Sequence, residues 1–375
     1  MEFIDLKRQL ALIEPDLMVR VRKVIENGHY ILGPEIKELE TVLADFTGRK
    51  YCISCANGTD ALLMALMALK IGPGDAVFTT AFSFFATAEV IALAGATPVF
   101  VDIDETYNMS VDDLEEKVAK VRDGKRVTEG TPERLVPKAV LPVDLFGLVA
   151  DYGRIEPVAK QYGLHIIEDA AQAFGGVYKG KKACSFGGIS TTSFFPAKPL
   201  GCYGDGGALF TDDPGLASVL ESIRVHGKGT DKYDNVRMGL NARLDTLQAA
   251  ILLAKWRVFE GEIAAKQIVA RKYREQLNRF VLQRIPQDCS SAWAQFCIQS
   301  PHRDAIINAL KKENIPTAIY YPKPLHLQTA FGYLKYPVGS CPYAEKVAAE
   351  IFSIPMHAYL SDEEVAKICS IVNNS

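Results

Sequence analysis

The segment around Lys198 holds the residue types with the clearest chemical potential in this sequence of 375 residues. Lys198 follows an apolar stretch, Ser193-Phe-Phe-Pro-Ala, and precedes a run of glycines that begins at Gly201. Most lysines lie at the surface in water. A lysine held inside by Pro199 and these glycines loses hydration, which lowers its pKa and leaves a nucleophilic amine. Such an amine can form an imine with the carbonyl group of a cofactor, and the glycines leave room for a bulky one.

Two further segments place polar groups at the expected ends of buried strands. Asp169 ends the run that starts at His165, and a carboxylate there needs a partner because burying an unpaired charge is costly. It caps a helix or pairs with a protonated ring nitrogen, and the segment alone does not decide between them. Gly58 and Thr59 stand between a strand and a helix, where backbone N–H groups and the Thr59 hydroxyl can hold a phosphate. An ordinary N-cap turn explains the same residues.

The elements that must position these residues alternate between strands and helices. The expected strands cover residues 51–55, 76–80, 97–101, 139–143, 164–167 and 191–195. Nearly continuous apolar strands separated by helices predict an α/β fold with a mostly parallel central sheet that is covered on both faces. Ligands bind such sheets beyond the carboxyl ends of the strands. After residue 245 a long helix and a mixed segment follow, so we expect a large domain at 1–255 and a smaller C-terminal α+β domain at 256–375.

The composition narrows the classes of protein and partner. Hydrophobic residues make up 48% and charged residues 23%, as in a globular protein with a large core. Lys and Arg total 42 and Asp and Glu total 45, and a net charge of −3 makes nucleic acid an unexpected partner. The longest apolar run, Ala61–Leu69, is too short to span a bilayer, so no membrane association is expected. The N-terminus lacks the features of a secretion signal, so we expect a cytoplasmic protein.

Several alternative motifs are incomplete. The eight cysteines are scattered, which indicates reduced thiols; Cys52 and Cys55 have the spacing of half a zinc site, but no second pair follows and no metal site is predicted. No Gly-x-Gly-x-x-Gly opens a helix after the first strand, which disfavours a nicotinamide-dependent oxidoreductase. Residues 175–182 approach a phosphate-binding P-loop, but Lys182 replaces its Ser or Thr, so we predict a basic hairpin turn there.

Taken together, the turn at Gly58 and Thr59, Asp169 at the end of its strand and Lys198 with its glycines form a pattern. This pattern resembles that of the pyridoxal-phosphate enzymes of the aspartate-aminotransferase fold. The closer resemblance is to the DegT/DnrJ/EryC1/StrS sugar aminotransferases, and it covers nearly the whole chain from Gly33 to His326. The motifs that carry it are Asn57-Gly-Thr59, Glu168-Asp-Ala-Ala-Gln172, Ser193-Phe-Phe-Pro-x-Lys198 and Asn241-x-Arg243-x-Asp245-x-x-Gln248.

The resemblance implies a fold-type-I enzyme with pyridoxal 5′-phosphate (PLP) as its cofactor. Lys198 would bond to the cofactor's aldehyde and later move a proton, while Asp169 would keep the pyridine nitrogen protonated. Gln172 would hydrogen-bond the phenolic oxygen, and Phe82 would stack on the ring, with a plain core aromatic as its alternative. The implied phosphate ligands are Gly58, Thr59, Ser193 and, from the neighbouring subunit of a homodimer with shared active sites, Asn241.

The resemblance also implies a substrate class. Arg243 would contact an anionic group of the substrate, with a surface ion pair as the plain alternative. Tyr321 and His326 match a Tyr-Pro-x-Pro-Leu-His feature associated with the sugar pocket of the family. The implied reaction transfers an amino group from L-glutamate to a UDP-linked 3-oxo sugar acid in surface-polysaccharide (O-antigen) biosynthesis. A 4-keto nucleotide sugar as acceptor and a non-catalytic regulator on the same fold are the alternatives. A dehydrating branch of the family has His where Lys198 stands, so the lysine argues against that branch.

Overall fold

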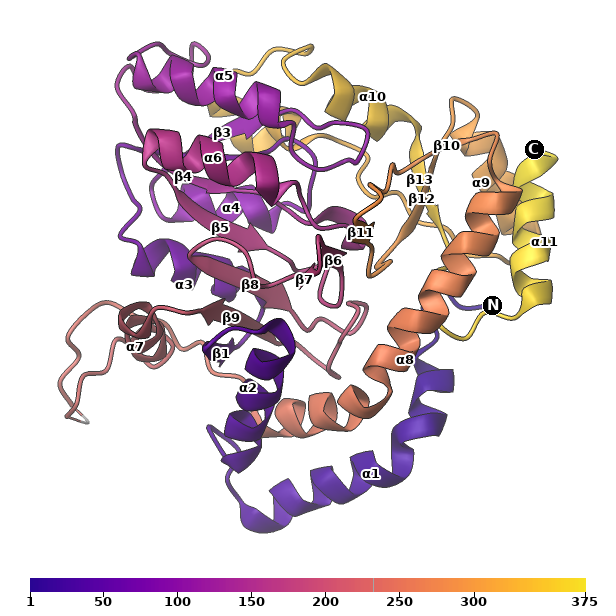
Figure 1. Ribbon diagram of the computed structural model, residues 1–375, viewed down its shortest axis with the longest axis horizontal. Helices are drawn as coiled ribbons and strands as arrows, with labels where there is room; N and C mark the ends of the chain where they lie inside the picture. Colours follow the sequence, from indigo (N-terminus) through magenta and orange to yellow (C-terminus); the bar gives the residue numbers. More distant parts are fainter. Residues whose placement is uncertain (232) are drawn as a thin grey trace.

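The computed structural model describes residues 1–231 and 233–375, and a seven-stranded sheet forms its centre (Figure 1). The strand order is β1-β9-β8-β5-β4-β2-β3. All neighbours from β3 to β8 are parallel, and β9 runs antiparallel to both β8 and β1. The predicted α/β fold with a mostly parallel sheet is therefore confirmed. The strands are β1 (Tyr51–Cys55), β2 (Asp75–Thr80), β3 (Thr97–Val101), β4 (Val136–Leu141), β5 (His165–Asp169), β8 (Ile189–Ser193) and β9 (Gly207–Thr211).

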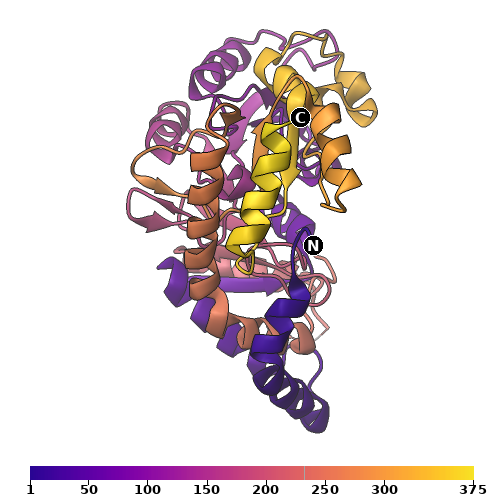
Figure 2. The ribbon, with the colours of Figure 1, turned by 90° about the vertical axis from the view of Figure 1, so that its right-hand side faces the viewer.

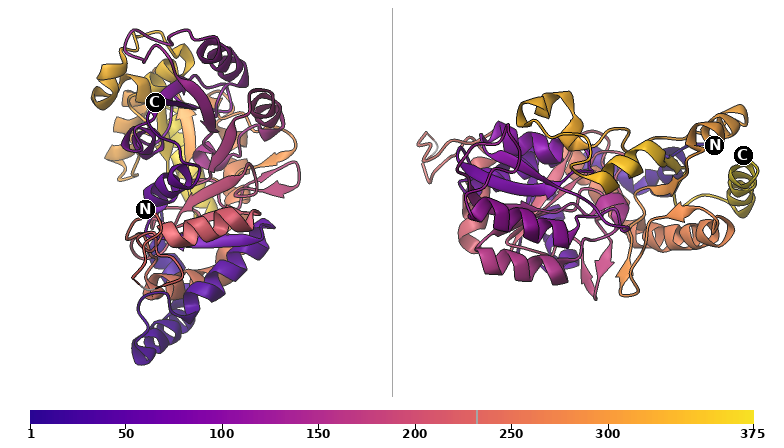
Figure 3. Two further views of the ribbon diagram at one scale, coloured as in Figure 1. Left: turned by 90° about the vertical axis from the view of Figure 1, so that its left-hand side faces the viewer. Right: turned by 90° about the horizontal axis from the view of Figure 1, so that it is seen from above.

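Alternate side chains of these strands enter two separate hydrophobic clusters, because successive residues of a strand point to opposite faces. Phe78 and Phe210 lie in one cluster, whereas their chain neighbours Val77 and Leu209 lie in the other. Figure 3 shows the helices on both sides of the sheet that complete these clusters. The first face is covered by α2 (Pro34–Thr47), α5 (Val111–Arg122) and α6 (Tyr152–Tyr162), and the second by α3 (Gly58–Ala68), α4 (Ala86–Leu93) and α7 (Pro214–Ile223).

The long helix α8 (Thr246–Gln276) leads from the central sheet to the C-terminal part of the chain (Figure 1). The helix continues through residue 255, so the division into 1–255 and 256–375 stays a prediction. After it comes a three-stranded antiparallel sheet with the order β10-β12-β13. The elements here are β10 (Val281–Leu282), β12 (Phe296–Gln299), α9 (Arg303–Lys312), two 3₁₀ helices (Leu325–Leu327 and Thr329–Leu334), α10 (Pro342–Glu350), β13 (Ile351–Ile354) and α11 (Asp362–Asn373).

Helix α1 (Leu6–Asn27) packs along α8, and the N-terminal residues lie beside the C-terminal part of the chain (Figure 2). The N–H of Met356 donates to the Phe3 carbonyl at 3.3 Å. In the region that resembled a P-loop, β6 (Val177–Tyr178) and β7 (Lys181–Lys182) form the predicted hairpin, and β11 (Cys289–Ser290) pairs with β6. A further 3₁₀ turn spans Leu145–Gly147. None of the helices in the described ranges is both long enough and apolar enough to cross a membrane.

Candidate active site

The three segments singled out by the sequence meet at one edge of the sheet. Asp169 and Ser193 are the last residues of the paired parallel strands β5 and β8, and α3 begins at Gly58 directly after β1. A Cβ atom built on Gly58 would lie only 2.7 Å from the Ser193 Cβ, so the start of α3 touches the end of β8. The site therefore forms at the carboxyl edge of the parallel strands, as expected for this sheet topology.

The start of α3 presents N–H groups that the helix itself does not use. Asn57 caps the helix: its side-chain oxygen accepts from the Asp60 N–H at 2.7 Å, and its carbonyl accepts from the Ala61 N–H at 3.1 Å. The N–H groups of Gly58 and Thr59 come before these first helix hydrogen bonds. Because the N-terminus of a helix carries partial positive charge, this turn is suited to a phosphate. Glycine is required at position 58 by the contact with β8 rather than by its backbone angles.

Asp169 is 4% exposed and accepts two hydrogen bonds. The Ala171 N–H donates to one oxygen at 3.2 Å, and the Thr87 hydroxyl donates to the other at 2.9 Å. Burial raises the pKa of Asp169, while both hydrogen bonds and the positive charge of Lys198 lower it. The carboxylate is thus held in a fixed orientation at the end of β5.

Lys198 lies in the loop that follows β8 and is partly buried. Strand β8 ends at Ser193, two residues earlier than predicted, and the Lys198 N–H donates to the Phe195 carbonyl at 2.8 Å in the turn that follows. Burial lowers the pKa of the Lys198 amine, and the nearby Asp169 carboxylate opposes this shift. A lysine with a lowered pKa is neutral, and therefore nucleophilic, more often at physiological pH.

The last residue of the motif that begins at Asn241 supports the same loop. The side chain of Gln248 on α8 bonds both backbone groups of Tyr203: it accepts from the N–H at 3.0 Å and donates to the carbonyl at 3.4 Å. The loop is closed against its strand by the Cys202 N–H, which donates to the Phe194 carbonyl at 2.8 Å. This explains a motif position to which the sequence assigned no role.

Gln172, Phe82 and Tyr321 come together beside Asp169. The Gln172 side chain accepts from the Phe146 N–H at 2.7 Å and donates to the Tyr321 hydroxyl at 2.9 Å. Phe82 is fully buried and makes edge-on contacts with the rings of Tyr321 and Phe146, at centroid distances of 6.0 and 6.4 Å. The structure thus places Gln172, Tyr321 and Phe82 in one contact group, while the stacking role of Phe82 stays a prediction.

His326 is not brought into this group. Its side chain is buried, its Nε2 lies 3.0 Å from a carboxylate oxygen of Glu345, and its ring packs against Phe100 and Tyr336. Burial lowers the pKa of His326, and the contact with Glu345 opposes this. In this single chain, His326 joins the 3₁₀ segment that carries it to α10, and its role in a sugar pocket stays a prediction.

Asn241 and Arg243 lie on the segment before α8. Asn241 is exposed and its backbone forms an isolated bridge with Val225. Arg243 is partly buried, and in the described parts of the chain its Nε is enclosed without a hydrogen-bond partner. The plain alternative for Arg243, a surface ion pair, is not found among the described residues.

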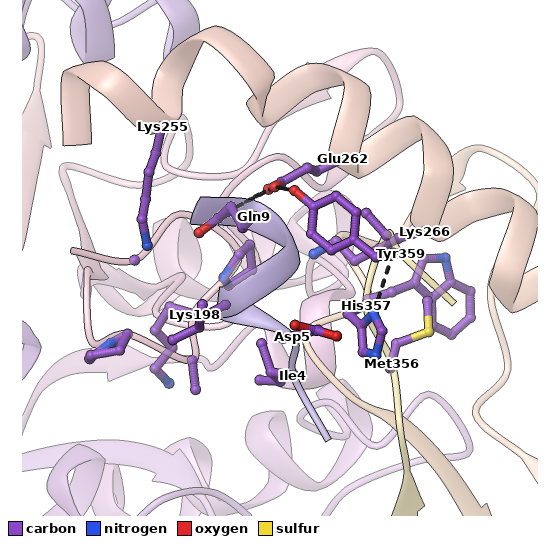
Figure 4. Close-up of a pocket in the computed structure, with 18 residues that line it drawn as sticks. Ile4, Asp5, Gln9, Lys198, Lys255, Glu262, Lys266, Met356, His357 and Tyr359 are labelled. Atoms are coloured by element: carbon purple, nitrogen blue, oxygen red, sulfur yellow. Dashed lines mark hydrogen bonds between the residues drawn. The ribbon is translucent and has the colours of Figure 1, made fainter. Parts of the chain in front are cut away.

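A small cavity of about 50 Å³ is lined in part by residues of the Lys198 loop (Figure 4). Lys255 and Lys266 of α8 line it, and burial lowers the pKa of each amine to about 8. Between them along the helix stands Glu262, which accepts from the Gln9 side-chain amide at 2.8 Å and from the Tyr359 hydroxyl. This cluster joins α1, α8 and the segment after β13 next to the loop that carries Lys198.

The model of the DegT/DnrJ/EryC1/StrS aminotransferase family matches residues 12–373. The chain belongs to this family. The resemblance inferred from the four motifs is therefore confirmed, and it extends over nearly the full length.

Individual relatives of this aminotransferase cover the chain almost completely. It is 46% identical to the UDP-2-acetamido-2-deoxy-3-oxo-D-glucuronate aminotransferase of Pseudomonas aeruginosa, over 100% of this chain and 99% of that protein. It is 42% identical to the pleiotropic regulatory protein of Geobacillus stearothermophilus, over 96% of this chain and 94% of that protein.

Two solved structures show the same fold. A DegT DnrJ EryC1 StrS aminotransferase from Brucella abortus is 50% identical, with a TM-score of 0.95 over 100% of this chain and 99% of that one. NtdA from Bacillus subtilis, solved with bound cofactor PMP, is 27% identical, with a TM-score of 0.86 over 99% of this chain and 82% of that one.

Proposed function

We propose that this protein is a PLP-dependent aminotransferase that transfers an amino group from L-glutamate to a UDP-linked 3-oxo sugar in the cytoplasm. The observation that carries the proposal is the Lys198 amine, whose pKa burial lowers, close to the buried Asp169 carboxylate at the carboxyl edge of the sheet. The turn at Gly58 and Thr59, which suits a phosphate, lies against the end of β8 in the same region.

The residues present fit PLP group by group. The N–H groups of Gly58 and Thr59, with the Ser193 hydroxyl beside them, would hold the phosphate. Asp169 would pair with the protonated ring nitrogen, and Gln172, which has one side-chain N–H left after its bond to Tyr321, would reach the phenolic oxygen. The bound PMP of the B. subtilis relative, the amino form of the same cofactor, supports this choice.

Lys198 and Asp169 have complementary tasks in this reaction. When bound, the cofactor supplies an electron sink for the electron pair released from the substrate C–H bond. Lys198 would hold the cofactor covalently, and its free amine would take that proton and return it to the product side as a general acid and base. Its lowered pKa favours the neutral form that takes up a proton. Asp169 remains an anion and holds the ring nitrogen in its protonated form.

The acceptor is inferred from the relatives and from Arg243. The P. aeruginosa relative acts, by its name, on a UDP-linked 3-oxo sugar acid, and it covers this chain from end to end. Arg243, with its unpaired guanidinium nitrogen, would bind an anionic group of such a substrate. We also propose a role in surface-polysaccharide (O-antigen) biosynthesis. The second candidate, a regulatory protein, is favoured by the name of the G. stearothermophilus relative, but this chain keeps both Lys198 and Asp169.

The substrate assignment is tested with a panel of nucleotide keto sugars. Purified protein with PLP and glutamate should convert a UDP-3-oxo sugar acid to its amine and release 2-oxoglutarate, both measured by chromatography. UDP- and dTDP-linked 4-keto sugars serve as matched acceptors and should react far more slowly. Reaction of a 4-keto sugar in place of the 3-oxo acid would show that the substrate assignment is wrong, and transfer to none of them would favour the regulatory candidate.

Asn241 is exposed in the single chain. A homodimer with shared active sites would explain this exposure, because Asn241 would then reach the phosphate in the neighbouring subunit. We expect Lys198→Ala and Asn241→Asp each to be nearly inactive alone, the latter because its charge repels the phosphate. Mixing the two variants under conditions of subunit exchange should restore about a quarter of wild-type activity, because half of the dimers then contain one intact site. Native mass spectrometry verifies the exchange. Mixed dimers without recovered activity would show that each site is built from one subunit.

A further inference from the structure

Behind Asp169 lies a short chain of buried hydroxyl groups on residues that the sequence did not single out. The Thr87 hydroxyl oxygen lies 2.9 Å from Asp169 Oδ2 and 3.1 Å from the Ser83 hydroxyl oxygen. Ser83, Thr87 and Asp169 are 3%, 2% and 4% exposed. Thr87 stands in the first turn of α4, and Ser83 lies in the loop between β2 and α4. Both hydroxyls are therefore placed by the element that follows β2.

The direction of these hydrogen bonds follows from counting protons. A hydroxyl has one hydrogen to donate, and the Thr87 hydrogen goes to the Asp169 carboxylate. The contact between Ser83 and Thr87 must then be donated by Ser83. Both hydroxyl dipoles point toward the carboxylate, and donors aligned in this way strengthen one another and favour its ionised form.

An ordinary helical role does not account for Thr87. A threonine in a helix usually returns its hydroxyl to a backbone carbonyl three or four residues earlier. Here the residue four positions earlier is Ser83, and its side-chain hydroxyl, rather than its carbonyl, contacts the Thr87 hydroxyl. The Thr87 hydrogen goes instead to the Asp169 carboxylate, 82 positions further along the chain. The bond ties α4 to the end of β5 at the residue on which the proposed chemistry depends.

Three groups oppose the effect of burial on the pKa of Asp169. Burial is the largest influence on the pKa of Asp169 and raises it. The Ala171 N–H, the Thr87 hydroxyl and the Lys198 charge lower it. Since the proposed function uses Lys198 as a neutral amine, its charge is not a permanent support. Ala171 and Thr87 are then the two constant donors, one for each carboxylate oxygen.

We propose that Thr87 is a positioning residue of the aminotransferase site: its hydroxyl, oriented by Ser83, keeps the Asp169 carboxylate ionised and turned toward the ring nitrogen of the cofactor. This inference rests on the proposed function. Thr87 does not contact the reacting atoms, and its effect reaches the cofactor only through Asp169.

The test compares PLP binding to the full-length protein, after removal of its cofactor, in the wild type, Thr87→Val and Thr87→Ser. In Thr87→Val, a nearly isosteric change, the pKa of free Asp169 rises, so PLP affinity should begin to fall at a pH about one unit higher than in the wild type. At pH values well below the pKa of Asp169 the dissociation constant should be about tenfold higher than that of the wild type at the same pH, and well above this pKa the two proteins should bind PLP equally. Thr87→Ser keeps the donor and should restore wild-type behaviour, and Ser83→Ala should shift the curve in the same direction by less.

Thr211→Val is the matched control, because Thr211 is also a buried threonine but its hydroxyl donates to the Gly188 carbonyl at 2.8 Å, at the opposite end of β8 from Ser193. It loses a buried hydroxyl bond and should leave the pH dependence of PLP binding unchanged. With glutamate, Thr87→Val should lower kcat about tenfold and leave KM nearly unchanged. A wild-type pH dependence of PLP affinity in folded Thr87→Val would overturn the role of Thr87 alone. Failure of the wild type to bind PLP would overturn the proposed function and this inference together.

Discussion

Lys198→Ala is expected to lower turnover by at least about 10³-fold, because the same amine binds the cofactor covalently and moves the proton. The loss should appear in the reaction with glutamate alone, before any sugar is added, since both halves of a transamination use this lysine. Stopped-flow absorbance of the bound cofactor measures that step. Borohydride reduction followed by mass spectrometry should find the cofactor on the wild-type peptide that contains residue 198 and not on that of the variant.

The matched control is Lys346→Ala on α10, an exposed lysine far along the chain from the site. It should leave both the turnover and the modified peptide as in the wild type. An unmodified wild-type peptide around residue 198, from protein fully loaded with PLP, would contradict the assignment of Lys198 and with it the proposed reaction.

Glu168→Ala is expected to reduce the free energy of unfolding by about 3–5 kcal/mol. Glu168 is fully buried next to Asp169, and its carboxylate accepts the Cys184 N–H at 2.7 Å and the Phe186 N–H at 2.8 Å. Its removal leaves both N–H groups buried without an acceptor. Urea denaturation followed by circular dichroism measures the change. An effect below about 1 kcal/mol would show that water replaces the carboxylate easily.

A second buried carboxyl group, Asp144, lies close to Glu168 and provides the control and a dependence on pH. Burial and the charge of Glu168 raise the pKa of Asp144 well above its usual value. Asp144→Asn keeps an acceptor for the Ala150 N–H and the Tyr152 hydroxyl and a donor toward Glu168, so it should cost less than about 1 kcal/mol.

The sign of the pH effect follows from the raised pKa. The folded protein binds the Asp144 proton more tightly than the unfolded chain, whose Asp pKa is about 3.9. The stabilisation by this group is complete below that pH and decreases as the pH rises toward the folded pKa. Wild-type stability should therefore fall more between pH 4 and 7 than that of Asp144→Asn. Parallel curves for the two proteins would contradict the raised pKa of Asp144.

Sequence reasoning found the three segments that the structure brings to one edge of the sheet, because each signal lies within a short, contiguous segment, while the roles of their residues stay predictions. A glycine at position 58, an acid at the end of an apolar strand and a lysine after another each show their local structure in a few residues, and parallel strands bring such strand ends to a common edge. The alternation of apolar strands with helices was sufficient for the α/β class. The sequence did not predict hydrogen bonds between side chains that lie far apart along the chain.

The sequence by itself determined the family, the α/β sheet and the segments that meet at the candidate site, because these depend on local patterns and on the general rules of parallel sheets. Only the tertiary structure decided that His326 pairs with Glu345, that Gln172 meets Tyr321, 149 positions away, and that Thr87 donates to Asp169. These contacts arise when separate elements pack, and each polar group that becomes buried takes the nearest partner. No spacing along the chain encodes which partner that is.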